Sequence, residues 1–226
     1  MLNDNFATIV AAVEEGRVIY DNVRKFVKFS VADNVGKVMV MLLAPFLGKP
    51  IPLLPLQLLW LNLLTDGLMG LGLGVEPAER DTMRRSPYSP KENIFSRGAG
   101  KHIAWVGTLI GTLALGIGAW YFYAGRETWQ TMVFTTLAFS QVWQALAARS
   151  TRDSFFIKPF SNPLLLGMAS VTFLLQVAVI YIPLLQGLFK TVPLTVTDFA
   201  ISMALSGLVF VGIEFEKWLT RRSNSG

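Results

Sequence analysis

The 226-residue chain contains no cysteine, a single histidine and few charged residues. The absence of cysteine excludes a disulfide scaffold, an iron–sulfur site and a Cys-ligated zinc site. With His102 alone, a His-rich metal centre is excluded as well. Neither a GxxxxGK[ST] phosphate loop nor a GxSxG nucleophile elbow occurs. The chain therefore has no visible means of hydrolysing ATP by itself.

Charged residues make up only 15% of the chain, whereas hydrophobic residues make up 52%. A soluble domain carries about 25% charged residues. This deficit indicates an all-α, polytopic transmembrane helical bundle. Six stretches are long and apolar enough to cross the bilayer, which takes about 20 residues. They cover residues 26–48, 53–74, 102–124, 129–148, 163–187 and 196–216.

The distribution of basic residues predicts the orientation of these six spans. If both termini are cytoplasmic, 16 of the 20 Lys and Arg residues lie on the cytoplasmic side. The outer loops then hold only Lys49, Arg126 and Lys190. This asymmetry follows the positive-inside rule. It also explains the net charge of +5 by membrane topology, without a nucleic-acid partner.

The second span carries a polar cluster of Asn62, Thr65 and Asp66. The spacing i, i+3, i+4 places all three on one face of a helix. Ionisable residues inside a span are costly and indicate a functional site. Their side chains offer the oxygen ligands that hard cations such as Ca²⁺ bind. The alternative is a polar cluster that only holds helices together.

Glycines follow this cluster at positions 67, 70, 72 and 74, and two more form a GxxxG in the third span, Gly107 and Gly111. The first group fits a helix broken near a transport site or close packing against a neighbouring helix. The GxxxG indicates close packing.

The first span carries Asp33, Asn34 and Lys37. Asp33 and Lys37 have the i, i+4 order that favours a helical ion pair, so a salt bridge is one interpretation. In the other, the Lys37 ammonium occupies a cation position. Gln141, in the fourth span, offers one more carbonyl oxygen or a hydrogen bond between helices.

Four segments together resemble P-type cation-transporting ATPases of the calcium-pump branch, that is, the sarcoplasmic/endoplasmic-reticulum type and its bacterial relatives. They are DNFATIVAAVEEGRVIYDNVRKFVKF (4–29), NVGKV (34–38), LQLLWLNLLTDG (56–67) and SPYSPKENIFS (86–96). The resemblance covers essentially the whole chain and implies the C-terminal six spans of a ten-span pump. The first four spans, with a ligating glutamate in the fourth, and the cytoplasmic domains that use ATP and Mg²⁺ would be the missing partners, besides the lipid bilayer.

The resemblance also assigns roles to residues of the polar clusters. Asn34, Asn62, Thr65 and Asp66 match metal-ligand positions for transported Ca²⁺. Lys37 and Gln141 stand where the reticulum pumps have glutamates, so Gln141 would be a vestigial ligand. Lys37, paired with Asp33, would serve as a built-in counter-cation. The resemblance thus implies that one calcium site is lost and that one Ca²⁺ moves per cycle.

These inferences divide the chain into five regions. We expect a cytoplasmic stalk helix (1–25), two ion-binding spans (26–74), a cytoplasmic loop that couples phosphorylation to ion movement (75–101), a four-span bundle (102–218) and a cytoplasmic tail (219–226).

Two alternatives stay open. The pump transports another cation, such as Mn²⁺, Na⁺ or one exchanged for protons, or the chain is a stand-alone, non-catalytic binding or regulatory membrane protein. The chain is part of an ATP-hydrolysing enzyme if it belongs to a pump for Ca²⁺ or for another cation, but not if it is a stand-alone protein. The composition favours a bacterial plasma membrane.

Overall fold

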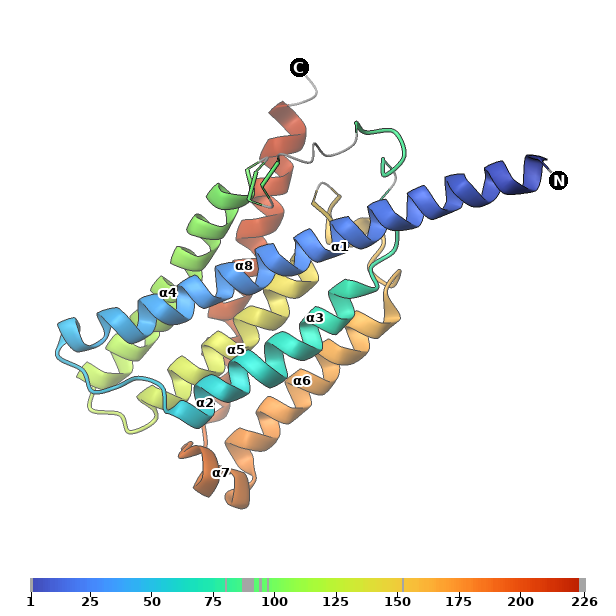
Figure 1. Cartoon of the computed structure of the whole chain (residues 1–226). Helices are drawn as coiled ribbons and strands as arrows, with labels where there is room; N and C mark the ends of the chain where they lie inside the picture. The colour runs from blue at the N-terminus through green and yellow to red at the C-terminus, as the bar shows by residue number, and fades with distance from the viewer. Residues whose placement is uncertain are drawn as a thin grey trace.

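The computed structural model describes residues 2–79, 81–86, 92, 93, 95, 96, 98–151 and 153–223. Within these residues the chain forms helices joined by turns, with no β-strand, which confirms the predicted helical bundle (Figure 1). Most of the 86–96 motif lies outside the described residues, as do Arg80, Arg97, Arg152 and the last three residues of the tail.

The helices follow the expected spans closely. They are α1 (Leu2–Leu43), α2 (Pro55–Leu59), α3 (Asp66–Gly74), α4 (Ala99–Tyr123), α5 (Trp129–Ala148), α6 (Pro163–Tyr181), α7 (Pro183–Phe189) and α8 (Val196–Ser223). A π-helical turn, Trp60–Thr65, joins α2 to α3. Short 3₁₀ turns lie at Pro45–Leu47 and Phe155–Ile157.

Helix α1 runs without a break from the expected stalk into the first predicted span. Its N-terminal part projects beyond the bundle, whereas its C-terminal part packs along α4 (Figure 1). Glycines permit the close approach of these two helices. A Cβ on Gly107 would lie 2.6 Å from the carbonyl oxygen of Ala32, and one on Gly36 would lie 2.8 Å from Ile110. The predicted close packing at the GxxxG is therefore confirmed.

Helix α5 is the centre of the bundle. It contacts α1, α3, α4, α6 and α8. Its buried residues include six polar ones, Thr131, Thr135, Thr136, Ser140, Gln141 and Gln144. Because α5 is surrounded by other helices, its polar side chains face protein rather than lipid.

Among the residues that the structure describes, four helical segments are long and apolar enough to span a membrane: Pro55–Gly74, Ala99–Tyr123, Pro163–Tyr181 and Val196–Arg222. The expected spans in α1 and α5 do not meet this criterion, because charged or polar residues lower their hydropathy. Both are packed among other helices, as expected for polar residues within a membrane bundle. The count of six spans stays a prediction.

The N-terminal half of α1, the C-terminal end of α8 and the described part of the segment between α3 and α4 lie at the same end of the bundle (Figure 1). Arg17 of α1 donates a hydrogen bond to the carbonyl oxygen of Thr82 over 2.9 Å. His102, near the start of α4, lies 2.6 Å from Glu216, near the end of α8. This shared end agrees with the expected topology, although the side of the membrane stays a prediction.

The helix expected over 163–187 is not continuous, which corrects the sequence-based boundary. Ile182 has extended backbone angles and separates α6 from α7. The residue before a proline is pushed away from the helical conformation, and Pro183 supplies no backbone N–H. Hydropathy alone does not detect this break.

Candidate cation site

The helix of the second predicted span widens at its polar cluster. The π-helical turn contains Asn62 and Thr65, and Asp66 follows at once as the first residue of α3. Such turns inside α-helices are frequent at functional sites. Of the two interpretations of the glycines after Asp66, the broken helix is not seen, since α3 continues to Gly74. The irregular backbone is the π-helical turn that contains Asn62 and Thr65.

Two of the glycines after the cluster serve close packing instead. A Cβ on Gly70 would lie 2.5 Å from the Phe26 ring, and one on Gly72 would lie 2.6 Å from Leu165. Between the two interpretations of these glycines, the structure favours packing against α1 and α6.

The ammonium group of Lys37 lies at the centre of the polar cluster. It forms an ion pair with Asp33, one turn earlier in α1, and donates a hydrogen bond to the side-chain oxygen of Asn62. It also lies 3.2 Å from Oδ2 of Asp66. The helical salt bridge is thus present, and the same ammonium also contacts Asn62 and Asp66, two of the expected ligands, whereas a role in place of a cation stays a prediction.

Gln141 brings the central helix α5 into the cluster. Its amide nitrogen donates to the carboxylate of Asp33 and lies 3.5 Å from the carbonyl oxygen of Leu61, within the π-helical turn. Both Gln141 and Asp33 are fully buried. The side chains of three helical segments therefore meet at one point.

Four buried oxygens of this cluster have no hydrogen-bond partner. They are Asp33 Oδ1, Thr65 Oγ1, Asp66 Oδ1 and Gln141 Oε1. Buried polar atoms are normally paired, so such a group of oxygens calls for an explanation. Carboxylate, hydroxyl and amide oxygens are the ligands of hard cations. The residues present thus fit a transported cation.

The described residues hold no group of three His, Cys, Asp or Glu side chains placed to bind a metal ion. A cation here would have two carboxylates, Asp33 and Asp66, and would otherwise depend on neutral oxygens. Asn34 is only half-buried, and the hydrogen bonds of the cluster do not include it. Asn62 is exposed on the surface of this chain.

Sequence reasoning missed a second set of buried polar residues that supports the π-helical turn. The indole of Trp60 donates to Oε1 of Gln176 on α6 over 3.1 Å. Gln57 donates to the carbonyl oxygen of Phe189 over 2.9 Å. The signal in the sequence that could have found them is a glutamine inside an otherwise apolar helix. The partner of each glutamine, however, lies more than 100 residues away along the chain.

The segment after α3 is docked on the stalk. Lys25 forms an ion pair with Glu79 over 3.0 Å, and Arg85 forms one with Asp21. Arg17 donates to the backbone oxygens of Thr82 and Arg85. The described part of the expected coupling loop is therefore attached to the stalk half of α1.

Comparison with known proteins gives a consistent result. Residues 50–219 match the family model described as the C-terminus of cation transporting ATPases. The chain is 40% identical over 211 residues to a Bacillus subtilis protein named calcium-transporting ATPase, covering 92% of the chain and 24% of the relative. It is also 36% identical to calcium-transporting ATPase 1 of Bacillus cereus, covering 96% of the chain and 26% of that relative.

A yeast relative shows the same pattern. The chain is 33% identical over 224 residues to calcium-transporting ATPase 1 of Yarrowia lipolytica, covering 98% of the chain and 24% of that protein. The chain thus spans about a quarter of the length of these relatives. With apolar helices long enough to span a membrane and a family match over most of its length, the chain belongs to the P-type cation-transporting ATPases, as a C-terminal, integral membrane region.

Proposed function

We propose that this chain is the C-terminal membrane part of an ATP-driven calcium pump and supplies ligands for the transported Ca²⁺. The observation that carries the proposal is the group of four unpartnered buried oxygens beside the π-helical turn. The relatives named calcium-transporting ATPases favour Ca²⁺ among the hard cations. Asn62, Thr65 and Asp66 would bind it, with Asn34 as a further candidate ligand.

Lys37 is proposed to act as a tethered counter-cation. Its ammonium neutralises Asp66 and Asp33 when the site holds no Ca²⁺, and it contacts the same Asp66 carboxylate that Ca²⁺ would bind. Lys37 and Ca²⁺ therefore compete for Asp66. Since Lys37 adds a positive charge and Gln141 adds none of the negative charge of a glutamate, the proposed site binds a single Ca²⁺ per cycle.

The coupling role of residues 75–101 is part of the same proposal. The ion pair of Lys25 with Glu79 and the hydrogen bonds of Arg17 support it, because they join the loop to the stalk half of α1. The domains that bind ATP and Mg²⁺ and receive the phosphoryl group would belong to the remaining three quarters of a pump like the relatives.

One surface of this chain is exposed where the remaining spans of such a pump could pack. Asn62 is exposed in this chain, and the side chains of Val38, Leu59 and Leu63 beside it are 54–70% exposed. A preceding span packed on this surface would complete the cation site. Lipid would cover the outer apolar faces, and we propose the bacterial plasma membrane as the location.

The first test is the size and activity of the native protein. An antibody against residues 79–97 should detect a polypeptide several times larger than 25 kDa in source membranes. Purified, that protein should hydrolyse ATP with Ca²⁺ and lose this dependence with Asp66→Asn, whereas Glu127→Gln, an exposed residue, should retain it.

Two outcomes contradict the proposal in different ways. Activation by Mn²⁺ or Na⁺ in place of Ca²⁺ would reassign the cation. The observation that favours one of these other cations is the ammonium between two carboxylates, because it leaves the site with little net negative charge. A single band near 25 kDa would contradict the pump and favour a stand-alone, non-catalytic membrane protein.

A further inference from the structure

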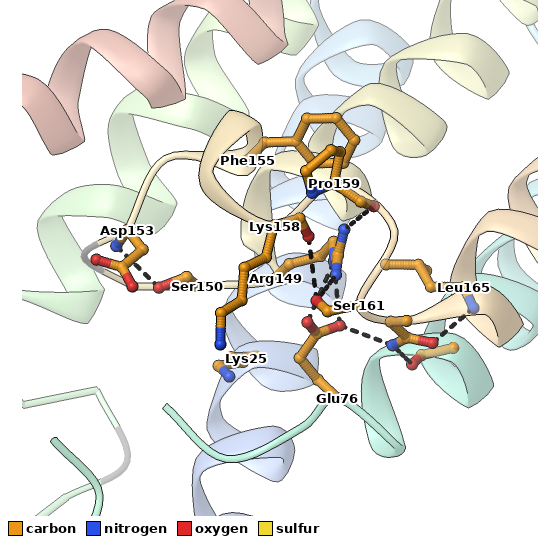
Figure 2. Close-up of polar contacts among 12 residues, drawn as sticks. Lys25, Glu76, Arg149, Ser150, Asp153, Phe155, Lys158, Pro159, Ser161 and Leu165 are labelled. Carbon is orange, nitrogen blue, oxygen red and sulfur yellow. Dashed lines mark hydrogen bonds and ion pairs between the residues drawn. The ribbon is translucent and has the colours of Figure 1, made fainter. Parts of the chain in front are cut away.

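A buried ion pair lies at the stalk end of the bundle, away from the cation site. Nε of Arg149 lies 3.1 Å from Oε1 and 3.2 Å from Oε2 of Glu76 (Figure 2). Glu76 follows the end of α3, and Arg149 follows the end of α5. Their exposed fractions are 6% and 5%, so water does not screen the pair.

The rest of the Arg149 guanidinium holds the segment between α5 and α6. Nη1 donates to the carbonyl oxygen of Pro159 over 2.6 Å, and Nη2 donates to Oγ of Ser161 over 2.5 Å (Figure 2). The guanidinium also lies over the Phe155 ring. Only the planar fork of an arginine can make these contacts together with the carboxylate.

Glu76 in turn joins two more helices. Asn162 donates to Oε2 of Glu76 over 2.7 Å and caps α6 by accepting from the backbone N–H of Leu165. Asn22 of α1 donates to the backbone oxygen of Glu76 over 2.8 Å. We call the ion pair, with its bonds to Pro159, Ser161 and Asn162, the Glu76–Arg149 clamp. Together with Asn22, the clamp connects the middle of α1 with the C-terminal ends of α3 and α5 and the N-terminal end of α6.

The clamp lies just past the C-terminal ends of α3 and α5, and the cation site lies earlier along both helices. Gly74, the last residue of α3, follows Asp66 by eight residues, and Arg149 follows Gln141 by eight residues. At 1.5 Å rise per residue, each step is about 12 Å along the helix. Helices α3 and α5 also contact each other directly. Gln141 of α5 thus lies near the carbonyl oxygen of Leu61 in the π-helical turn before α3, and the clamp joins the residues that follow α3 and α5.

A second set of contacts joins this region to the stalk. Glu79, three residues after Glu76, forms the ion pair with Lys25 of α1. Oε1 of Glu79 also accepts from the backbone N–H of Thr151, two residues after Arg149, over 3.2 Å. Glu79 and Thr151 therefore connect the stalk to the residues that follow α5.

We propose that Arg149 is a positioning residue for cation binding. It keeps α5, with Gln141, in register with α3, with Asp66, and so makes the segment 149–162 a second coupling element beside the loop 75–101. A buried ion pair is in itself weak evidence for stability, since apolar residues of the same volume often serve as well. The exact fit of five polar contacts around one guanidinium and its carboxylate argues instead for control of position. This inference rests on the proposed transport function.

The test uses a pair of substitutions that leaves no unpaired buried charge. Glu76→Gln with Arg149→Met removes the ion pair but retains similar volumes. The matched control is Asp198→Asn with Arg126→Met, which removes the 3.2 Å ion pair at the other end of the bundle. Because the chain has no cysteine, spin labels can be attached at Leu71→Cys and Phe156→Cys, whose native side chains are 62% and 72% exposed.

Two measurements follow. In the 226-residue chain in lipid nanodiscs, the distribution of label distances should become at least twofold broader in the Glu76/Arg149 variant and stay unchanged in the control. In the native pump, the Ca²⁺ concentration for half-maximal ATPase activity should rise at least threefold, with the maximal rate and the control within twofold of the parent. Arg149→Lys, which retains the charge without the fork, should lie between.

Two results would overturn the inference. An unchanged distance distribution means that Arg149 does not hold these elements together. A broader distribution with an unchanged half-maximal Ca²⁺ concentration means that the clamp is structural only. If the parent protein shows no Ca²⁺-dependent activity at all, the proposed function fails instead, and the label distances alone decide whether Arg149 positions the segment between α5 and α6 against α3.

Discussion

The ammonium of Lys37 lies 3.2 Å from the carboxylate of Asp66, although the two residues are 29 positions apart and belong to different helices. The same ammonium reaches Asp33 and Asn62. A positive charge of the chain itself thus occupies the polar cluster. A cation bound here, as proposed, would either displace this charge or share the carboxylates with it.

Reversing the charge of Lys37 should change the number of bound ions. With Lys37→Glu, the cluster gains a carboxylate and loses an ammonium, so we expect one additional Ca²⁺ per native pump. Equilibrium dialysis with radioactive Ca²⁺ at saturating concentration measures this number. Lys190→Glu, at an exposed position, should bind as the parent does. An unchanged number in Lys37→Glu would refute the proposal of a lost calcium site.

Removing the charge without reversing it should make stability depend on Ca²⁺. Lys37→Met leaves Asp33 and Asp66 buried near each other without their cation, which costs about 3–5 kcal/mol for a broken buried ion pair. We expect a lower melting temperature in the absence of Ca²⁺ and a larger rise on adding Ca²⁺ than in the parent, because a ligand of the folded state stabilises it.

A second substitution checks the cause of this effect. Adding Asp33→Asn to Lys37→Met removes one of the two unbalanced charges and should recover much of the loss in melting temperature. If the double variant melts no higher than Lys37→Met, electrostatics in the cluster does not explain the loss.

The contact between α1 and α4 predicts a difference between two glycines of the same helix. Gly107→Ala would place its Cβ 2.6 Å from the backbone oxygen of Ala32, so the helices must separate, at a cost of about 1–3 kcal/mol. Gly116→Ala meets nothing within 4 Å and should leave the melting temperature unchanged or higher. Thermal unfolding in detergent compares the two. Equal melting temperatures would contradict the close packing of α1 on α4.

The expected topology is open to labelling, because the chain has no native cysteine. A cysteine at Lys190 should react with a membrane-impermeant maleimide from outside the cell. A cysteine at Phe156 should react only in inside-out vesicles. Both native side chains are exposed, so reagent access depends on the membrane side alone. Labelling of both positions from one side would contradict six spans with cytoplasmic termini.

The helical elements could be predicted because they depend on local patterns. The helix Trp129–Ala148 begins and ends where the sequence predicted, and Asn62, Thr65 and Asp66 were recognised as a cluster from their spacing alone. The break at Ile182 was missed, because hydropathy is averaged over many residues whereas the break depends on Pro183. The π-helical turn was missed for a different reason, since the residues that anchor it, such as Gln176, are distant in sequence.

The sequence by itself determined the class of this protein: a helical membrane bundle, its P-type ATPase family and the residue types around a cation. Composition, periodicity and short motifs carry that information locally. Only the tertiary structure decided that Lys37 reaches Asp66, that Gln141 bonds to Asp33 across 108 positions and that Arg149 pairs with Glu76 across 73. Helix packing decides such pairs, because a buried charge is tolerated only where a partner from another helix meets it.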